Sequence, residues 1–402
     1  MSPRVKLCLY VLSALADFTP VIVVFTVSRN LAEAGTEPLM MGLVGGVYAI
    51  GQGIGSILGG WLAHRFHSAG VFLTGAGLLC AATIGCASFE TATTGQMLSY
   101  WLMSVGVGFF FPPLIGWLNQ GEDAHQNRRG VSRTLILYCV AWNLGMIQGQ
   151  LLGGSLFAID PQWCLRAGVA AALVNGGLSL LCVRWIRHTT LPVPVVTPTA
   201  HALLELAAAF KQLSWLANLA GMFGASMVVH LLPDLAVSIG IPPQDHGLLL
   251  AGWRVVVIGT YLVMHQFVFW HYRFRVAFLS QLVAAAGLAL IALAQSPLSL
   301  MLGLAMLGQL VGYNYFAGLY YSTAGSAHEG RVWSASMHEA TLAVGMAVGT
   351  IAGGALGTWI GHRAPYGLAS LVTILLLTVQ TIAYFRWIPP LRRAAPSPST
   401  SY

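Results

Sequence analysis

The ten residues from Gly145 to Gly154 read GMIQGQLLGG, and the ten residues from Gly345 to Gly354 read GMAVGTIAGG. The methionine and all four glycines occupy the same places in the two segments, which are 200 positions apart. A match of this kind between distant segments indicates an internal repeat, and a repeat decides the architecture of a chain. The sequence therefore predicts two similar halves, each close to 200 residues long.

Two weaker matches support the same division. The segment HRFH at 64–67 resembles YRFR at 272–275, and D-x-x-P at 17–20 resembles H-x-x-P at 230–233. The offsets of the three matches are similar, between 200 and 213 residues, and this agreement argues against a chance origin. The last match places Asp17 opposite His230 in the repeat.

The composition of the chain excludes a water-soluble globular fold. Of its 402 residues, 56% are apolar and only 8% are charged, whereas a soluble globular domain is about one quarter charged. A water-facing surface cannot be covered at that level, and the apolar fraction excludes disorder. Six cysteines without a CxxC pair predict neither a disulfide framework nor a zinc site. The net charge of +7 is not concentrated in a basic and aromatic cluster, so no nucleic acid is expected as a partner.

The lengths of the apolar runs predict the topology. A helix needs about 20 apolar residues to cross a hydrocarbon core of about 30 Å, whereas the strands of a membrane barrel would alternate apolar and polar residues. Runs of sufficient length lie near residues 5–27, 39–62, 69–89, 96–118, 134–158, 165–187, 213–238, 247–268, 276–295, 298–322, 334–360 and 366–387. We therefore expect an all-α integral membrane protein with twelve transmembrane helices in two six-helix, pseudo-symmetric halves. The expected divisions are an N-terminal half at 1–187, a cytoplasmic central loop at 188–212, a C-terminal half at 213–387 and a cytoplasmic tail at 388–402.

The basic residues give an independent check on this topology. Fifteen of the 19 lysines and arginines fall on the side of the termini, whereas Arg29, Arg166 and Arg363 lie opposite and Arg254 lies inside a span. The positive-inside rule then places both termini in the cytoplasm and the multi-pass protein in the plasma (inner) membrane. A cleaved signal peptide is the alternative for the first span, but its apolar run continues past Asp17 and is long enough to cross the membrane.

Two six-helix halves joined by a cytoplasmic loop resemble the major facilitator superfamily of secondary transporters, over nearly the whole chain. The loop after the second span keeps the family's glycine and arginine as Gly60 and Arg65, with His64 where the family has aspartate. The resemblance implies that these three residues form a gating loop. In the fifth span, the glycines around Gln150 resemble the family's antiporter signature, but Gln150 replaces its proline, so the motif does not indicate antiport.

Ionisable residues within the spans are the candidates for proton coupling. A charge near the centre of a bilayer costs about 2.5–3.5 kcal/mol on insertion scales, so each such group needs a partner, water or a proton. Asp17 lies near the middle of the first span, and Glu339 and His230 lie in the eleventh and seventh. The alternatives are a structural carboxylate at Asp17, an ion pair of Glu339 with Arg331 and a hydrogen-bonded structural histidine at His230.

Other polar and aromatic residues in the spans are candidates for binding a solute. They are Asn143, Gln150, Trp142, Tyr138, Asn314, Tyr313, His338 and Arg254. Tyrosine and tryptophan in membrane helices also serve as packing or interfacial residues. Because Asp234 and Arg254 have similar depths in consecutive spans, we expect a structural ion pair between them, with an anion-binding role of Arg254 as the alternative.

These observations predict secondary active transport of a small organic solute by alternating access, coupled to a proton. The sequence contains no HExxH, GxSxG or P-loop motif, so we expect neither an enzyme nor a metal or nucleotide cofactor. A monomer in the lipid bilayer is expected. The alternative is a transport-inactive sensor on the same fold. The identity of the solute and the choice between symport and antiport remain open, because the fold does not decide them.

Overall fold

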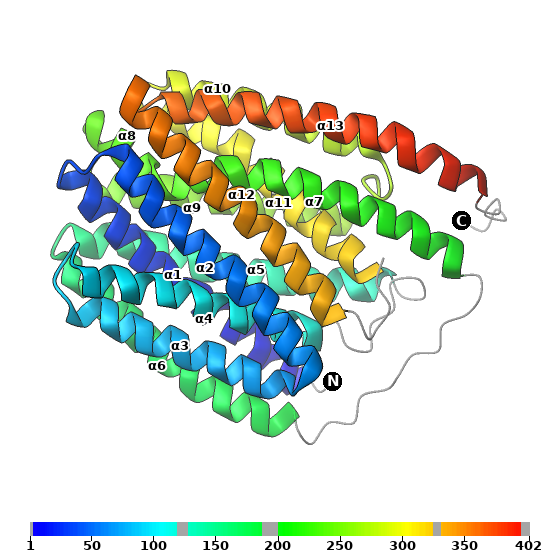
Figure 1. The fold of residues 1–402 in the computed structure, drawn as a ribbon, viewed down its shortest axis with the longest axis horizontal. Coiled ribbons are helices and arrows are strands. Elements are labelled where there is room, and N and C mark those ends of the chain that lie inside the picture. The colour runs from blue at the N-terminus through cyan, green and yellow to red at the C-terminus, as the bar shows by residue number, and fades with distance from the viewer. Residues whose placement is uncertain (1–2, 119–127, 187–199, 325–330, 395–402) are drawn as a thin grey trace.

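The computed structural model describes residues 3–118, 128–186, 200–324 and 331–394, and within these ranges the chain forms thirteen helices and no strand (Figure 1). The helices are α1 (Pro3–Glu33), α2 (Pro38–Arg65), α3 (Ser68–Ser88), α4 (Thr94–Leu118), α5 (Arg128–Phe157), α6 (Pro161–Ile186), α7 (Ala200–His230), α8 (Leu232–Ser238), α9 (Pro243–Gln266), α10 (Phe274–Leu293), α11 (Pro297–Ala324), α12 (Arg331–Ile360) and α13 (Ala364–Ala394). Twelve of them are long and apolar enough to cross a membrane, which confirms the predicted number of spans.

The seventh predicted span differs from the others because it consists of two helices. Helix α7 ends at His230 and the short α8 begins at Leu232, with Pro233 in its first turn. A proline has no amide hydrogen and its ring crowds the preceding turn, so a continuous helix is disfavoured here. Helix α7 also begins earlier than expected, at Ala200, so residues 200–212 of the predicted central loop are helical. Residues 187–199 lie outside the described residues.

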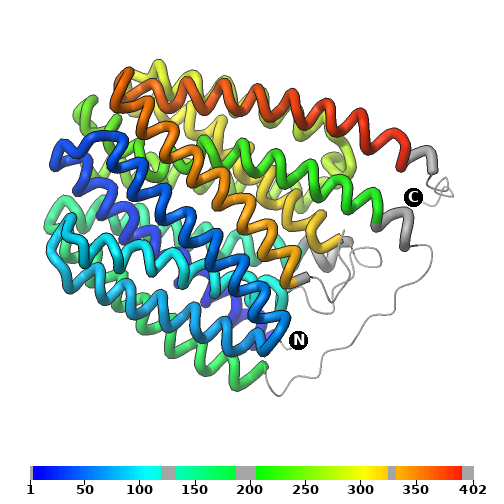
Figure 2. The backbone as a smooth tube through the Cα atoms, viewed as in Figure 1, coloured from blue at the N-terminus to red at the C-terminus, as the bar shows by residue number. Residues whose placement is uncertain are grey.

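The helices form two bundles that lie side by side (Figures 1 and 2). Helices α1–α6 build the first half, and helices α7–α13 build the second. Helix α2 packs against α12 and helix α5 packs against α9 across the boundary. The start of α1 and the end of α13 lie at the same end of the bundle, which we call the inner end, and the opposite end is the outer end.

The repeated glycines form two equivalent seams between the halves at the outer end. A Cβ atom on Gly354 of α12 would lie 2.6 Å from the carbonyl oxygen of Pro38 and 3.0 Å from Cα of Gly42, both in α2. A Cβ atom on Gly154 of α5 would lie 2.6 Å from the carbonyl oxygen of Pro243 in α9. Backbones can approach this closely only where the side chain is absent. The same motif therefore holds α12 to α2 and α5 to α9.

Glycines earlier in the motif pack α5 and α12 within their own halves. A Cβ atom on Gly149 would lie 3.1 Å from the carbonyl oxygen of Phe18 in α1, and Gly349 packs in the same way on the carbonyl of Phe223 in α7. Phe18 and Phe223 are 205 positions apart, as are Pro38 and Pro243 at the seams. The contacts of the repeat therefore set a common offset of 205 between α1–α2 and α7–α9.

This offset corrects one expectation from the sequence. With an offset of 205, Asp17 corresponds to Met222 and not to His230. The short D-x-x-P and H-x-x-P match was wrong, because two shared positions do not fix a register when the glycine contacts fix another. A methionine and not a histidine therefore stands at the position of the second half that corresponds to Asp17.

The halves also touch at the inner end. Gly60 of α2 packs directly on Ser336 of α12, and a Cβ atom on Gly116 of α4 would lie 2.5 Å from the side chain of Val332 in α12. The space enclosed between the halves thus lies between an inner and an outer zone of contact.

Candidate functional site

A central cavity with an empty volume of about 1160 Å³ lies between the two halves. Residues of α1, α2, α4 and α5 line it from the first half, and residues of α7, α8, α9, α11 and α12 line it from the second. Much of the lining is apolar, including Phe25, Phe111, Met146, Met222 and Met346. Clefts with a mainly apolar lining and a few convergent polar groups are typical binding sites for small organic molecules.

Asp17 lies in the wall of this cavity. It follows Pro3 by fourteen residues, or about 21 Å of helix, which places it close to the middle of the 31-residue α1. Its side chain is 8% exposed and interacts electrostatically with Arg254, which attracts it, and with Glu339, which repels it. Both of those residues come from the second half. The structure therefore brings together three charged groups that are far apart in the sequence.

Glu339 is held by a chain of hydroxyl groups that crosses the boundary between the halves. The hydroxyl of Tyr315 in α11 donates to Oε1 of Glu339 at 3.1 Å, and the hydroxyl oxygens of Tyr315 and Tyr138 lie 3.3 Å apart. All three residues line the cavity. Tyr315 was missed in the sequence, where it is one of several tyrosines in the same apolar helix and nothing marks its orientation.

Arg254 projects into the cavity from α9. Its guanidinium carbon lies 4.1 Å from the ring centroid of Trp253 and 5.9 Å from that of Trp142, distances at which a cation is attracted to an aromatic face. Its side chain is buried, and its Nε atom has no hydrogen-bond partner in the described part of the chain. The indole Nε1 of Trp142 is also without a partner there.

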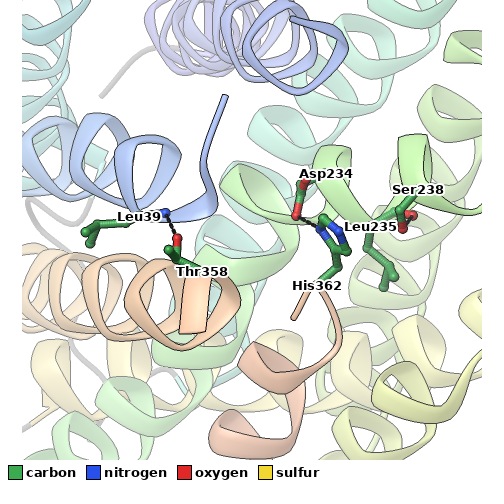
Figure 3. A network of polar contacts seen from close by, with 6 residues as sticks. All are labelled: Leu39, Asp234, Leu235, Ser238, Thr358 and His362. Atoms are coloured by element: carbon green, nitrogen blue, oxygen red, sulfur yellow. Dashed lines mark hydrogen bonds and ion pairs between the residues drawn. The ribbon is translucent and has the colours of Figure 1, made fainter. Parts of the chain in front are cut away.

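The predicted ion pair between Asp234 and Arg254 was wrong. Oδ2 of Asp234 lies 2.5 Å from Nδ1 of His362, in the loop between α12 and α13 (Figure 3). Helix α9 begins at Pro243, four residues before the predicted start of the span, so Arg254 lies about 6 Å deeper than expected. The break after α7 separates Asp234 from the body of that helix, and the carboxylate therefore pairs at the outer end.

Two hydrogen bonds join the halves at the outer end. The amide of Leu39 in α2 donates to Oγ1 of Thr358 in α12 at 2.9 Å (Figure 3). Nη2 of Arg29 in α1 donates to the carbonyl oxygen of Ile241 at 3.0 Å, while its Nε bonds Glu33 at 2.8 Å. Ile241 follows Gly240, whose φ of +74° suits a residue without a side chain. The sequence placed Arg29 on this side but gave no sign of its contact with the second half.

Two histidines add imidazole groups to the wall of the cavity. His230 and His246 both line it, and His246 packs against Phe25 with a ring-centroid distance of 5.1 Å. His230 fits beside Gly45, where a Cβ atom would lie 2.5 Å from the imidazole. His246 was not predicted, because the sequence placed it just outside the eighth span. Within the described residues, no group of three or more His, Cys, Asp or Glu side chains could hold a metal ion.

The remaining candidates divide between the cavity and the protein interior. Tyr138, Trp142 and Gln150 line the cavity as expected. His338 is buried behind Tyr315, with a ring-centroid distance of 5.2 Å, and does not line it.

Three further candidates face away from the central cavity, which corrects their predicted location. Nδ2 of Asn143 donates to the carbonyl of Cys139 at 2.8 Å. Asn314 and Tyr313 line a second, smaller cavity of about 330 Å³ within the second half. Asn314 is turned toward α7, because its Nδ2 donates to a carbonyl oxygen of that helix at 2.8 Å.

The predicted gating loop lies at the inner end of α2. Gly60 allows α2 to contact Ser336 of α12, whereas His64 and Arg65 are exposed. The guanidinium carbon of Arg65 lies 5.6 Å from the ring centroid of Trp61 on the same helix. Among the residues that the structure describes, the contact between the halves at this point is therefore the close packing of Gly60 on Ser336.

The fold and the cavity together define a polytopic helical membrane protein that encloses a solute-sized space between two similar halves. The chain belongs to the Major Facilitator Superfamily, whose model matches residues 7–337. Membership in this superfamily makes the chain a multi-pass membrane protein of a transporter family.

Two solved structures show the same fold. The chain is similar to the human organic anion transporter MFSD10 (TETRAN), with a TM-score of 0.71 and 14% identity over 94% of this chain and 100% of that one. It is also similar to a bacterial homolog of the human lysosomal transporter Spinster, solved in an inward-facing and unoccupied conformation, with a TM-score of 0.65 and 15% identity over 99% of this chain and 100% of that one. No curated protein matches the sequence.

Proposed function

We propose that this protein carries out secondary active transport of a small organic solute by alternating access, coupled to the movement of a proton. The observation that carries the proposal is that Asp17 and Glu339, from opposite halves, line one cavity together with Arg254. Charged groups buried at this depth are costly, and in membrane proteins they mark the paths of substrates and ions.

The contacts between the halves are of a kind that can open and close. Among the described residues, those at the outer end include the glycine seams and the hydrogen bonds from Leu39 and Arg29, and those at the inner end include the packing of Gly60 and Gly116. Smooth helix surfaces with small residues separate without the loss of large interlocked side chains. We infer that one set of contacts parts while the other holds, so that the cavity opens to one side at a time.

The charges of the cavity support a coupled proton. With both carboxylates ionised and Arg254 positive, the three groups carry a net charge of −1, since the two histidines are neutral when unprotonated. A proton bound to either carboxylate makes the set neutral, so the free energy of these buried charges depends on whether that proton is present. We assign the exchange to Asp17 and Glu339, with His230 as a further group that can relay a proton.

The remaining features of the proposal follow from the sequence. Tyr138, Trp142 and Gln150 would contact the solute, since they line the cavity. The excess of basic residues on the side of the termini supports a plasma (inner) membrane protein with both termini in the cytoplasm. We propose that the monomer is the functional unit and that no cofactor is needed.

The proposal is tested with purified protein reconstituted into liposomes that contain a pH-sensitive dye. Sugars, nucleosides, organic acids and amines are added one class at a time, and the internal pH is recorded. We expect at least one class to move protons, and we expect the combined replacement of both carboxylates, Asp17→Asn with Glu339→Gln, to uncouple this movement. Asp160→Asn is the matched control, because Asp160 caps α6 through the amide of Gln162 in an exposed loop and asparagine caps equally well.

A solute that binds but moves neither itself nor a proton would overturn transport and favour the sensor alternative. Proton movement that survives in a protein with both carboxylates replaced would overturn the assignment of the coupling groups.

A further inference from the structure

The chemistry of the central cavity carries an inference about its substrate, and this inference rests on the proposed function. We propose that the cavity binds an amphipathic organic anion, a carboxylate on an aromatic or aliphatic body. Arg254 anchors the anionic group, and the anion binds together with a proton on Asp17. The two therefore cross the membrane in the same direction, as a symport.

Unpartnered hydrogen-bond donors point to an anionic ligand group. Nε of Arg254 and Nε1 of Trp142 are buried and without a hydrogen-bond partner in the described residues, although both side chains line the cavity and the guanidinium carbon lies 5.9 Å from the ring centroid of Trp142. A buried donor left unpaired destabilises the protein, and a charged donor does so more strongly. An oxyanion accepts hydrogen bonds from both groups at once, and a guanidinium binds a carboxylate through two parallel bonds. The pair therefore forms a site for one anionic group.

The walls around this pair select the body of the ligand. Phe25 and Phe111 contribute aromatic faces, and Met146, Met222 and Met346 contribute flexible thioethers. Aromatic rings and methionines bind apolar groups of varied shape. The anionic group binds at Arg254 and Trp142, and these apolar side chains accommodate the rest of the ligand. The ligand that fits is therefore charged at one end and apolar at the other.

The charges around Arg254 link the anion to a proton. Asp17 already attracts Arg254 across the boundary between the halves, whereas Glu339 accepts a hydrogen bond from Tyr315. A bound anion adds a further negative charge to the cavity that Asp17 and Glu339 line, and the resulting repulsion favours uptake of a proton on one oxygen of the Asp17 carboxylate. The titratable groups that line the cavity around Asp17 are Glu339 of α12, Arg254 and His246 of α9, Tyr48 of α2, Tyr138 of α5, His230 of α7 and Tyr315 of α11.

An organic cation is the competing ligand, and the observed contacts disfavour it. Glu339 already accepts a hydrogen bond from Tyr315, and a cation bound at Asp17 would share the cavity with Arg254. It would also come close to the buried guanidinium, whose like charge repels it. The donors of Arg254 and Trp142 would remain unpaired in such a complex. The arrangement of partners therefore favours the anion.

Three probes with the same apolar body test the charge preference. They are 3-phenylpropionate, 3-phenylpropylammonium and 3-phenylpropanol, and their binding to the purified wild-type protein in detergent is measured by calorimetry. We expect the carboxylate to bind at least about tenfold more tightly than the other two. Tighter binding of the ammonium or the alcohol, or no binding of the carboxylate, would overturn the proposal.

Variants at Arg254 locate the anion site. We expect Arg254→Gln to weaken binding of 3-phenylpropionate at least about tenfold, with Arg254→Lys in between because it keeps the charge without the planar fork. Arg166→Gln is the matched control: Arg166 is an exposed arginine over Trp163 at the outer end of α6, and its replacement should leave binding unchanged. Thermal unfolding checks each variant for folding. Should Arg254→Gln fail to fold, the wild-type probe series and Arg254→Lys decide the point.

Calorimetry in two buffers with different heats of ionisation tests the link to the proton. We expect about one proton to be taken up for each carboxylate bound, and affinity to fall as pH rises, because the proton bound with the anion becomes scarce. Uptake should vanish in Asp17→Asn and persist in Glu339→Gln. Proton uptake that is absent in the wild type, or that is lost only in Glu339→Gln, would overturn the role of Asp17.

Transport is then tested separately with 3-phenylpropanesulfonate, which stays ionised and does not cross lipid as a neutral acid. If the protein takes up this sulfonate with protons, both proposals are supported. If the anions bind at Arg254 but do not cross, the anion site stands and the transport function fails. If the ammonium probe is transported and the anions are not, transport stands and the anion site fails.

Discussion

The outer seam between α2 and α12 gives a stability prediction whose size follows from the structure. In Gly354→Ala, the new methyl group would lie 2.6 Å from the carbonyl oxygen of Pro38 and 3.0 Å from Cα of Gly42. Ordinary contact begins near 3.4 Å, so the two helices must separate by about 0.8 Å. Both contacts are backbone atoms, which cannot rotate away. Overpacking of this kind costs about 1–3 kcal/mol.

The matched control is Gly177→Ala in α6, where no atom lies within 4 Å of the new methyl group and the residue is exposed. An alanine there should stabilise the helix by about 0.5–1 kcal/mol, because glycine loses more backbone freedom on folding. The two variants carry the same substitution but change stability in opposite directions. Their free energies of unfolding should therefore differ by about 1.5–4 kcal/mol. Thermal unfolding of the purified proteins in detergent measures the difference.

The pseudo-symmetry of the seams extends this prediction. Gly154→Ala should destabilise as much as Gly354→Ala, because its methyl group would meet the carbonyl oxygen of Pro243 at the same 2.6 Å. If Gly354→Ala melts at or above the temperature of Gly177→Ala, the close approach of α2 and α12 is refuted. If only one of the two seam variants is destabilised, the equivalence of the seams is refuted.

Three further outcomes can be checked at other contacts. Arg29→Lys should lower the melting temperature and increase the chemical labelling of side chains at the outer end, because a lysine lacks the planar fork that bonds Glu33 and the facing backbone carbonyl together. Unchanged labelling would contradict a role of Arg29 in holding the outer end closed. Asp234→Asn and His362→Ala should show a coupling of about 0.2–1 kcal/mol in a double-mutant cycle, the range for a partly exposed pair, and strict additivity would contradict the contact. Tyr315→Phe should destabilise the protein by about 1–3 kcal/mol, because it leaves the buried carboxylate of Glu339 without its donor, and wild-type stability would exclude that hydrogen bond.

The architecture could be predicted from the sequence because the bilayer imposes simple lengths. Twelve apolar runs of sufficient length became the twelve spans, and the repeat around Gly145 and Gly345 became the two equivalent seams. The register of the weaker match at Asp17 and His230 was wrong, since two shared residues do not outweigh the packing of a helix. Helix ends were also misplaced where prolines begin a helix in the interfacial region, as at Pro243.

The site could be predicted only in part. Asp17, Glu339 and Arg254 were recognised because any ionisable residue in a span is conspicuous. The orientation of a side chain around its helix depends on neighbours that the sequence does not reveal. Asn314 therefore turned toward α7 instead of the cavity, and Tyr315, one residue further along, was the group that bonds Glu339.

Alternating access is tested most directly by distances between spin labels at the two ends of the same bundle. In a background without the six native cysteines, Ile159→Cys with Leu298→Cys reports on the outer end, and Phe66→Cys with Val268→Cys reports on the inner end. All four side chains are exposed, and each pair spans the two halves. Double electron–electron resonance at low and high pH should show one distance lengthening as the other shortens. Distances that stay fixed, or that change together in the same direction, would contradict alternating access.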